Sequence, residues 1–174
     1  MFLKVLFLLI LNLSIVLSSE LNIKGFNSKM SFEQACKMFK LIKLEDIKRP
    51  FIQRDTWCGY ISSPANFVGD NEGGYIAKNK KNGTVKTIFW GKNTIDALFG
   101  NTDNLTIIDF TTVFIKNYKL DGKLFEMKRS RDGDVVISGK NNDEGWHIII
   151  SHLTYWTTLN LYIEFFEPPK LNFN

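Results

Sequence analysis

Three Asx-Gly pairs punctuate the chain after Gly73: Asn82-Gly83, Asp121-Gly122 and Asp132-Gly133. Each pair separates runs that are rich in β-branched and aromatic residues. Asx and Gly tolerate the positive φ of a type I′ turn, so each pair is typical of a β-hairpin. Together they predict a chain of short antiparallel strands.

The turns place these strands along the sequence. The first joins 74–80 to 84–90, and the other two make residues 112–138 a three-stranded meander. Further strands are expected at 104–110, 145–150 and 158–166. We expect a loop with one turn of helix at 92–103.

The last strand alternates cleanly between apolar and polar residues, which is typical of a half-buried strand. The pair Pro168-Pro169 ends it, because proline cannot donate to a β-ladder. Its apolar face holds Leu159, Leu161, Ile163 and Phe165, and its other face holds Asn160, Tyr162, Glu164 and Phe166.

One helix is expected before the strands, at residues 31–47. Ser31 is its N-cap, with Gln34 at the third position completing a capping box. Phe32, Cys36 and Phe39 form an apolar stripe at helical spacing. A helix followed by about eight strands predicts a mainly β fold: an antiparallel β-sandwich or jelly-roll-like domain, with an up-and-down β-barrel as the alternative.

The chain begins with a short Lys4-containing segment, an apolar run from Val5 to Leu17, and small residues. This layout is typical of a secretory signal peptide, so we expect residues 1–18 to be removed and 19–174 to form one secreted domain. The apolar run is shorter than the ~20 residues of a membrane helix, so no stable span is expected after removal.

Cys36 and Cys58 are the two cysteines of the sequence. An even count in an oxidising compartment favours pairing, so we predict an intramolecular disulfide. A buried free thiol or an intermolecular bridge are the alternatives. On the chain-entropy account the disulfide is worth roughly 3 kcal/mol.

The charge balance is mildly basic, with 22 Lys and Arg against 18 Asp and Glu. Such a small excess does not predict a nucleic-acid partner. The cluster "KRSR" at 128–131 allows an acidic or heparin-like partner, but we interpret it as a solvated edge strand protected by its charge.

The two histidines, His147 and His152, are five residues apart. On a regular strand an odd spacing places them on opposite faces, so they cannot share a metal or a substrate. No zinc-ligand spacing is present either. We therefore expect no metal site and no cofactor. The oxygen-rich loops at 69–74 and 141–145 leave Ca²⁺ as an alternative.

The loop "NNDEG" and the tryptophan after it are the main candidates for a ligand site. Amide and carboxylate groups beside an exposed indole could hold a sugar ring. The candidate ligand-binding residues are Asn141, Asn142, Asp143, Trp146 and His147, although a core position for Trp146 is the competing interpretation. Asn82 and Asn104 begin N-glycosylation sequons.

These features predict a secreted, non-catalytic module that binds an extracellular glycan or protein through loops at one end of the sheet. Two alternatives remain open. One is a secreted hydrolase or ribonuclease that uses His147, and the other is a lipid carrier with an apolar barrel cavity.

Overall fold

The computed structural model describes residues 20–45, 47, 49–60, 73–153 and 158–168. The described strands form one antiparallel sheet with the order β1-β2-β3-β4-β8-β7-β6-β5. Their bounds are β1 (Ile52–Gln53), β2 (Trp57–Gly59), β3 (Gly74–Lys78), β4 (Val85–Trp90), β5 (Phe125–Arg129), β6 (Val135–Asn141), β7 (Trp146–Leu153) and β8 (Thr158–Phe165).

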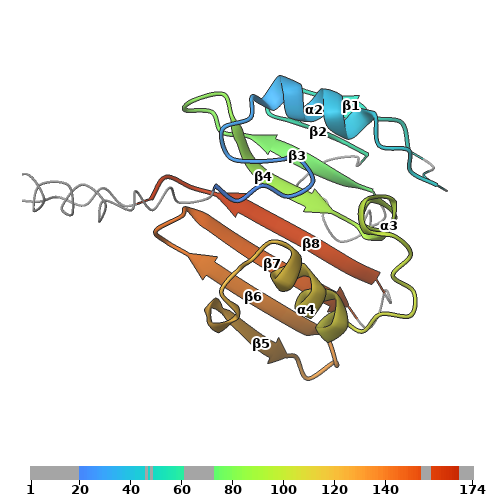
Figure 1. Ribbon diagram of the computed structural model, residues 1–174. Coiled ribbons are helices and arrows are strands. Elements are labelled where there is room, and N and C mark those ends of the chain that lie inside the picture. The colour runs from blue at the N-terminus through green and yellow to red at the C-terminus, as the bar shows by residue number, and fades with distance from the viewer. Residues whose placement is uncertain (1–19, 46, 48, 61–72, 154–157, 169–174) are drawn as a thin grey trace, which may run out of the picture.

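Helices lie against one face of this sheet. Figure 1 shows α2 (Phe32–Lys40) over the β1–β3 end and α4 (Ile107–Asn117) crossing β6 and β7. Between them, α3 (Lys92–Phe99) contacts β4 and β8. A short 3-10 helix, η1 (Gly122–Leu124), connects α4 to β5.

The core lies between the helices and the sheet. One row of directly paired residues crosses five strands and is fully buried, namely Cys58, Ile76, Ile88, Ile163 and Ile148. Directly paired residues point to the same face, so this row faces the helices. The row continues on β6 at Gly139, where a Cβ would meet the Phe125 ring at 2.5 Å. The glycine therefore makes room for an aromatic ring from the edge strand.

The N-terminal helix and the disulfide are confirmed. The Ser31 side chain accepts a hydrogen bond from the Gln34 amide, and buried Phe32, Cys36 and Phe39 face the core. The helix ends at Lys40, earlier than predicted, with Leu41 as its C-cap. A disulfide joins Cys36 on α2 to Cys58 on β2. It links α2 covalently to the sheet.

Two of the three predicted hairpin turns are confirmed. Gly83 has φ 76° between β3 and β4, and Gly133 has φ 87° between β5 and β6. These conformations suit glycine because it has no Cβ. The prediction for Asp121-Gly122 is wrong. Asp121 caps η1 by accepting a hydrogen bond from the Lys123 amide.

The strands predicted at 104–110 and at the start of the 112–138 meander are wrong, because this region forms α4. Thr106 and Asp109 make a reciprocal capping box that starts the helix. Ile107, Phe110 and Phe114 recur at helical spacing and are buried. The loop predicted at 92–103 likewise contains α3 over its first eight residues. Packing against the sheet outweighs the β propensity of the Ile, Thr, Val and Phe residues in these segments.

The fold prediction as a whole is confirmed at the level of class. The described chain is mainly β, with eight antiparallel strands and an N-terminal helix. The signal peptide expected at 1–18 lies outside the described residues. In the described part of the chain, no helix is long and apolar enough to cross a membrane.

Candidate functional site

Strand β7 keeps a regular register, and this separates the two histidines as predicted. His147 pairs with Glu164 on β8, whereas His152 pairs with Leu159. His147 therefore lies on the face opposite the core row, which we call the open face, and His152 lies on the helix side. The two imidazoles do not converge.

The predicted ligand loop is divided by the same register. Trp146 is 1% exposed and packs in the core, where its indole N–H donates to a Glu144 carboxylate oxygen at 2.8 Å. The Asn141 side chain accepts hydrogen bonds from the amides of Asp143 and Glu144, which organises the turn. Trp146 and His147 thus lie on opposite faces, and the five predicted residues do not form one site.

A polar cavity of about 360 Å³ lies beside this turn. Several of its polar groups already support the structure. Glu20 accepts a hydrogen bond from Ser28, and the Asn22 side chain accepts one from the Gly25 amide. Its lining residues are Glu20, Leu21, Asn22, Asn117, Tyr118, Lys119, Leu120, Asp121, Asn141, Glu144 and Trp146. We therefore interpret this cavity mainly as a hydrogen-bonded junction.

A second cavity, of about 370 Å³, lies on the open face, and we call it the sheet-face groove. Register explains its floor, because Phe89, Tyr162 and Ile149 are directly paired neighbours on β4, β8 and β7. Polar side chains flank this floor. The groove is lined by Phe89, His147, Ile149, Ser151, Asn160, Tyr162 and Glu164.

The tyrosines of the open face stay protonated at neutral pH. Burial raises the pKa of the Tyr162 phenol, and the nearby Glu164 carboxylate acts in the same direction. Burial, with Tyr162 and Glu164, raises the pKa of Tyr75 to about 12. The Glu164 carboxylate is 3.7 Å from the ammonium of Lys86. Among its described lining residues, the groove therefore combines an uncharged aromatic floor with the Glu164 carboxylate at its edge.

Asn160 carries an unusual feature of the groove. The residue is 4% exposed, and its Nδ2 donates to the Thr158 carbonyl at 3.3 Å. Its Oδ1 atom is buried and has no hydrogen-bond partner among the described residues. A buried acceptor without a donor costs about 1–3 kcal/mol. Such a group in the lining of a cavity is typical of a position where a ligand or water supplies the donor.

His147 has a partner on the neighbouring strand. Its Nε2 lies 2.9 Å from the Ser138 hydroxyl oxygen, across the β6–β7 pair. A serine and a histidine at this distance resemble a nucleophile with its base. The same hydrogen bond also serves to orient the imidazole at the edge of the groove.

The Ca²⁺ alternative rests on the acidic loops at 69–74 and 141–145. No group of three or more His, Cys, Asp or Glu side chains arranged to hold a metal ion occurs within the described ranges. In the acidic loop at 141–145, carboxylate and amide groups are engaged with the turn and with Trp146. The other acidic loop, at 69–74, falls mostly outside the described residues.

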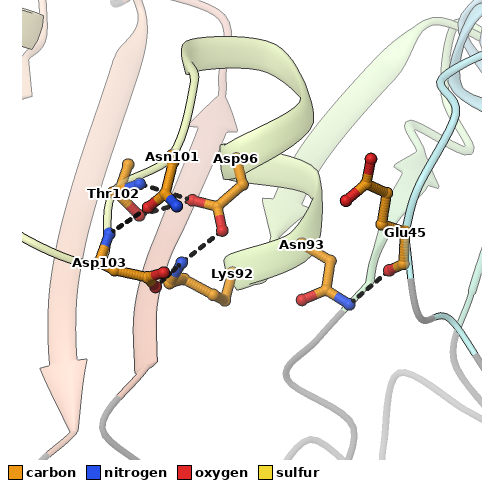
Figure 2. Close-up of polar contacts among 7 residues, drawn as sticks. All are labelled: Glu45, Lys92, Asn93, Asp96, Asn101, Thr102 and Asp103. Atoms are coloured by element: carbon orange, nitrogen blue, oxygen red, sulfur yellow. Dashed lines mark hydrogen bonds and ion pairs between the residues drawn. The ribbon is translucent and has the colours of Figure 1, made fainter.

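Lys92 lies at the centre of a cluster of polar side chains, shown in Figure 2. Its ammonium contacts the carboxylate of Asp96, and it lies 2.7 Å from that of Asp103. Asp96 also accepts hydrogen bonds from the amide and hydroxyl of Thr102. On the other side of α3, Asn93 donates to the Glu45 carbonyl. The cluster ties the α3–α4 connection to α3.

The pKa shifts in this cluster indicate a structural role. Burial alone would lower the pKa of Lys92, but hydrogen bonds with Asp103 and Asp96 outweigh it and raise the pKa above 10.5. The hydrogen bond with Lys92 lowers the pKa of Asp103 below 3.8. A lysine with a raised pKa is protonated at neutral pH, so it is a poor nucleophile or base.

These shifts predict how the stability of the cluster depends on pH. The stabilisation from Lys92 is complete below pH 10.5 and is lost as pH rises through the higher pKa of the folded state. That from Asp103 is present above pH 3.8 and is lost as pH falls through its lowered folded pKa. Lys92→Met should therefore lower the free energy of unfolding at pH 7 by about 1 kcal/mol and flatten both dependences.

Urea unfolding of wild type and Lys92→Met between pH 3 and 11 checks this prediction. Lys80→Met is the control, since Lys80 is an exposed lysine of the β3–β4 turn. Equal curves for Lys92→Met and wild type would show that the cluster contributes nothing to stability.

The alternation of the last strand is the one local sequence signal for the sheet-face groove. The alternation of 158–166 placed Asn160, Tyr162 and Glu164 on one face, as observed. It did not reveal that this face is opposite the helices, or that Phe89 and Ile149 lie beside Tyr162. The predicted edge strand at "KRSR" is confirmed for Lys128 and Arg129, since they belong to β5 and β5 ends the described sheet, whereas Ser130 and Arg131 follow the strand.

Comparisons with protein-family models, with curated proteins and with solved structures find no match to this chain.

Proposed function

We propose that this chain is a secreted, non-catalytic protein that binds an extracellular carbohydrate in the sheet-face groove. The observation that carries the proposal is the unpartnered Oδ1 of Asn160 beside an aromatic floor. Small-ligand sites are usually concave, largely apolar and equipped with a few placed polar groups. This groove has that character, and it moves the proposed site from the loops to the open face.

A sugar suits both parts of the groove. Its C–H face can lie on Tyr162 and Ile149, and its hydroxyls can donate to Asn160 Oδ1 and to the Glu164 carboxylate. His147, held by Ser138, adds a further hydrogen-bonding group at the edge. A protein partner would need a larger contact, on the order of 800 Å² on each side.

Secretion is part of the proposal. The apolar N-terminal run is typical of a signal peptide, and the Cys36–Cys58 disulfide suits an oxidising compartment. Both sequon asparagines, Asn82 and Asn104, are exposed, so we propose them as glycosylation sites. Asn82 lies in the β3–β4 turn, where its side chain accepts a hydrogen bond from the Thr84 hydroxyl.

A glycan screen on the purified secreted chain tests the proposed function. For the sugar that binds best, Asn160→Leu and Tyr162→Ala should each weaken binding by about tenfold or more, since a buried polar contact or stacking is worth at least 1.4 kcal/mol. Asn160→Leu removes the unpartnered Oδ1 and also the Nδ2 hydrogen bond to the Thr158 carbonyl, so the two effects oppose each other and the free energy of unfolding should change by less than about 1 kcal/mol.

Asn142→Ala is the matched control, because Asn142 is an exposed amide of the loop first predicted to bind. It should leave the affinity unchanged. If Asn142→Ala weakened binding and Asn160→Leu did not, the site would be at the end of the sheet. If no glycan bound, the carbohydrate assignment would be wrong.

The Ser138–His147 contact favours one second candidate, a secreted hydrolase. In that reading the Ser138 hydroxyl is the nucleophile and His147 takes its proton. A panel of chromogenic esters and glycosides tests it. Activity that both Ser138→Ala and His147→Ala abolish, with unfolding curves unchanged, would support the hydrolase over the binding module.

A further inference from the structure

Strand β5 is an edge strand with an unusual exposed surface. It pairs only with β6 in the described sheet, and Glu126, Met127, Lys128 and Arg129 are all exposed. Met127 is 55% exposed. Edge strands present backbone groups that can pair with another strand, and proteins usually protect or use them. The outer edge of β5 can therefore pair with a further strand.

The hairpin turn fixes which backbone groups point outward. The Ser130 amide donates to the Asp134 carbonyl at 2.8 Å, so Ser130 is directed toward β6. Antiparallel strands alternate between residues directed toward one neighbour and residues directed toward the other. Phe125, Met127 and Arg129 therefore direct their backbone groups away from β6. Consistently, the Phe125 amide donates to Gly122, outside the β5–β6 ladder.

This outward set limits how β5 can pair with a second copy of itself. Outward residues must face outward residues, so the two-fold axis passes through residue 126, 127 or 128. An axis at Glu126 places the two Glu126 side chains opposite each other, and an axis at Lys128 does the same for the lysines. Centring on Met127 instead places each Glu126 opposite Lys128 of the other copy.

We propose that β5 pairs antiparallel with β5 of a second copy, centred on Met127. Within the chain, Glu126 lies opposite Ser138 and Lys128 lies opposite Val136, so β6 places no opposite charge beside either residue. In the proposed dimer, the second copy provides that opposite charge. On the other face, the two Met127 side chains meet, and each Arg129 lies opposite a Phe125 ring, an arrangement that allows a cation–π contact.

The pairing charges favour one register of the two β5 strands over the registers next to it. In the Met127-centred register both ion pairs are favourable, whereas the registers centred on Glu126 and on Lys128 oppose like charges. Opposite residues share a face, so the pair forms one continuous sheet with both open faces on the same side. If the proposed function holds, two sheet-face grooves then bind one multivalent glycan together.

The dimer should be weak and dependent on concentration. The strand has five residues, and pairing adds about four backbone hydrogen bonds between Met127, Arg129 and Phe125 of the two copies. Contacts of this size are well below the area of a stable interface. We expect a dissociation constant on the order of 0.1–1 mM, from affinities of small interfaces.

Charge reversal combined with mixing tests the register. Glu126→Lys opposes lysines at both ion-pair positions, and Lys128→Glu opposes glutamates. Each variant alone should dimerise about tenfold more weakly than wild type, or weaker still, in sedimentation velocity over concentrations up to 1 mM. An equimolar mixture of the two restores opposite charges at both positions, so the mixture should dimerise at least as well as wild type.

Recovery of dimers in the mixture also shows that both variants are folded, since a variant that failed to fold could not pair. Lys80→Glu, with the same charge change in the β3–β4 turn, should dimerise like wild type. Amide hydrogen exchange should slow at Met127 and Arg129 as concentration rises. A wild type that stays monomeric at 1 mM would overturn the proposal, and so would a mixture that stays monomeric although wild type dimerises and both variants keep the circular dichroism spectrum of wild type. Neither result bears on glycan binding in the groove.

Discussion

Trp146→Ala should lower the free energy of unfolding by about 3–5 kcal/mol, the range for truncating a large buried aromatic residue. Trp146 is 1% exposed, and its ring lies 6.0 Å from that of Phe125. The substitution leaves a cavity between β7 and the edge strand. It also leaves the Glu144 carboxylate without the indole donor it now accepts from.

Guanidinium unfolding followed by circular dichroism measures this effect, with Glu144→Gln as the control. That change keeps the indole packed and alters mainly the hydrogen bond, so it should cost about 1 kcal/mol or less. A loss below 1 kcal/mol for Trp146→Ala would show that Trp146 contributes little packing. The residue would then be available to a ligand, as the sequence-based prediction of a site at 141–147 requires.

Removing the disulfide in the Cys36→Ala/Cys58→Ala variant should lower the free energy of unfolding by about 3 kcal/mol. The bond joins residues 22 apart, with Cα atoms 5.9 Å apart, and restricts the unfolded chain. Both cysteines are fully buried in the core, so the variant also loses packing between α2 and β2. The effect should be largest at this end of the sheet, where β1 and β2 are short.

Unfolding with and without dithiothreitol checks the mechanism. The reductant should lower the stability of wild type toward that of the variant and leave the variant unchanged. Hydrogen exchange should rise first in α2 and β2. If the variant matched oxidised wild type in stability, the proposed coupling between helix and sheet would be wrong.

Elements whose signals are local could be predicted from the sequence. Ser31 and the Phe32, Cys36 and Phe39 stripe predicted α2, and the Asn82-Gly83 and Asp132-Gly133 pairs predicted two hairpins. Each signal spans a few residues, and the interactions that it predicts are made between those same residues. The separation of His147 from His152 was predictable for the same reason, since it needs only the alternation of one strand.

Helix α4 shows where local signals compete. Its sequence, IIDFTTVFIKN, is rich in residues that favour strands, yet Thr106 and Asp109 form a capping box and Ile107, Phe110 and Phe114 recur at helical spacing. The strand predicted at 104–110 rests on β propensity alone and takes no account of the cap. The sheet decides between them, because α4 packs across β7 and buries this stripe.

The sequence by itself determined that this chain is mainly β with an N-terminal helix, that its cysteines can pair, and which residues of each strand share a face. Alternation, caps and turns act over a few residues, so they can be read directly. The tertiary structure decided which face the helices cover, and so placed Trp146 in the core and Tyr162 in the groove. It also brought Phe89 and Asn160 into one groove and left β5 at the edge. Strand order and register pair residues that are far apart in the chain. Their free energy depends on how all strands bury one face together, so no short segment determines it.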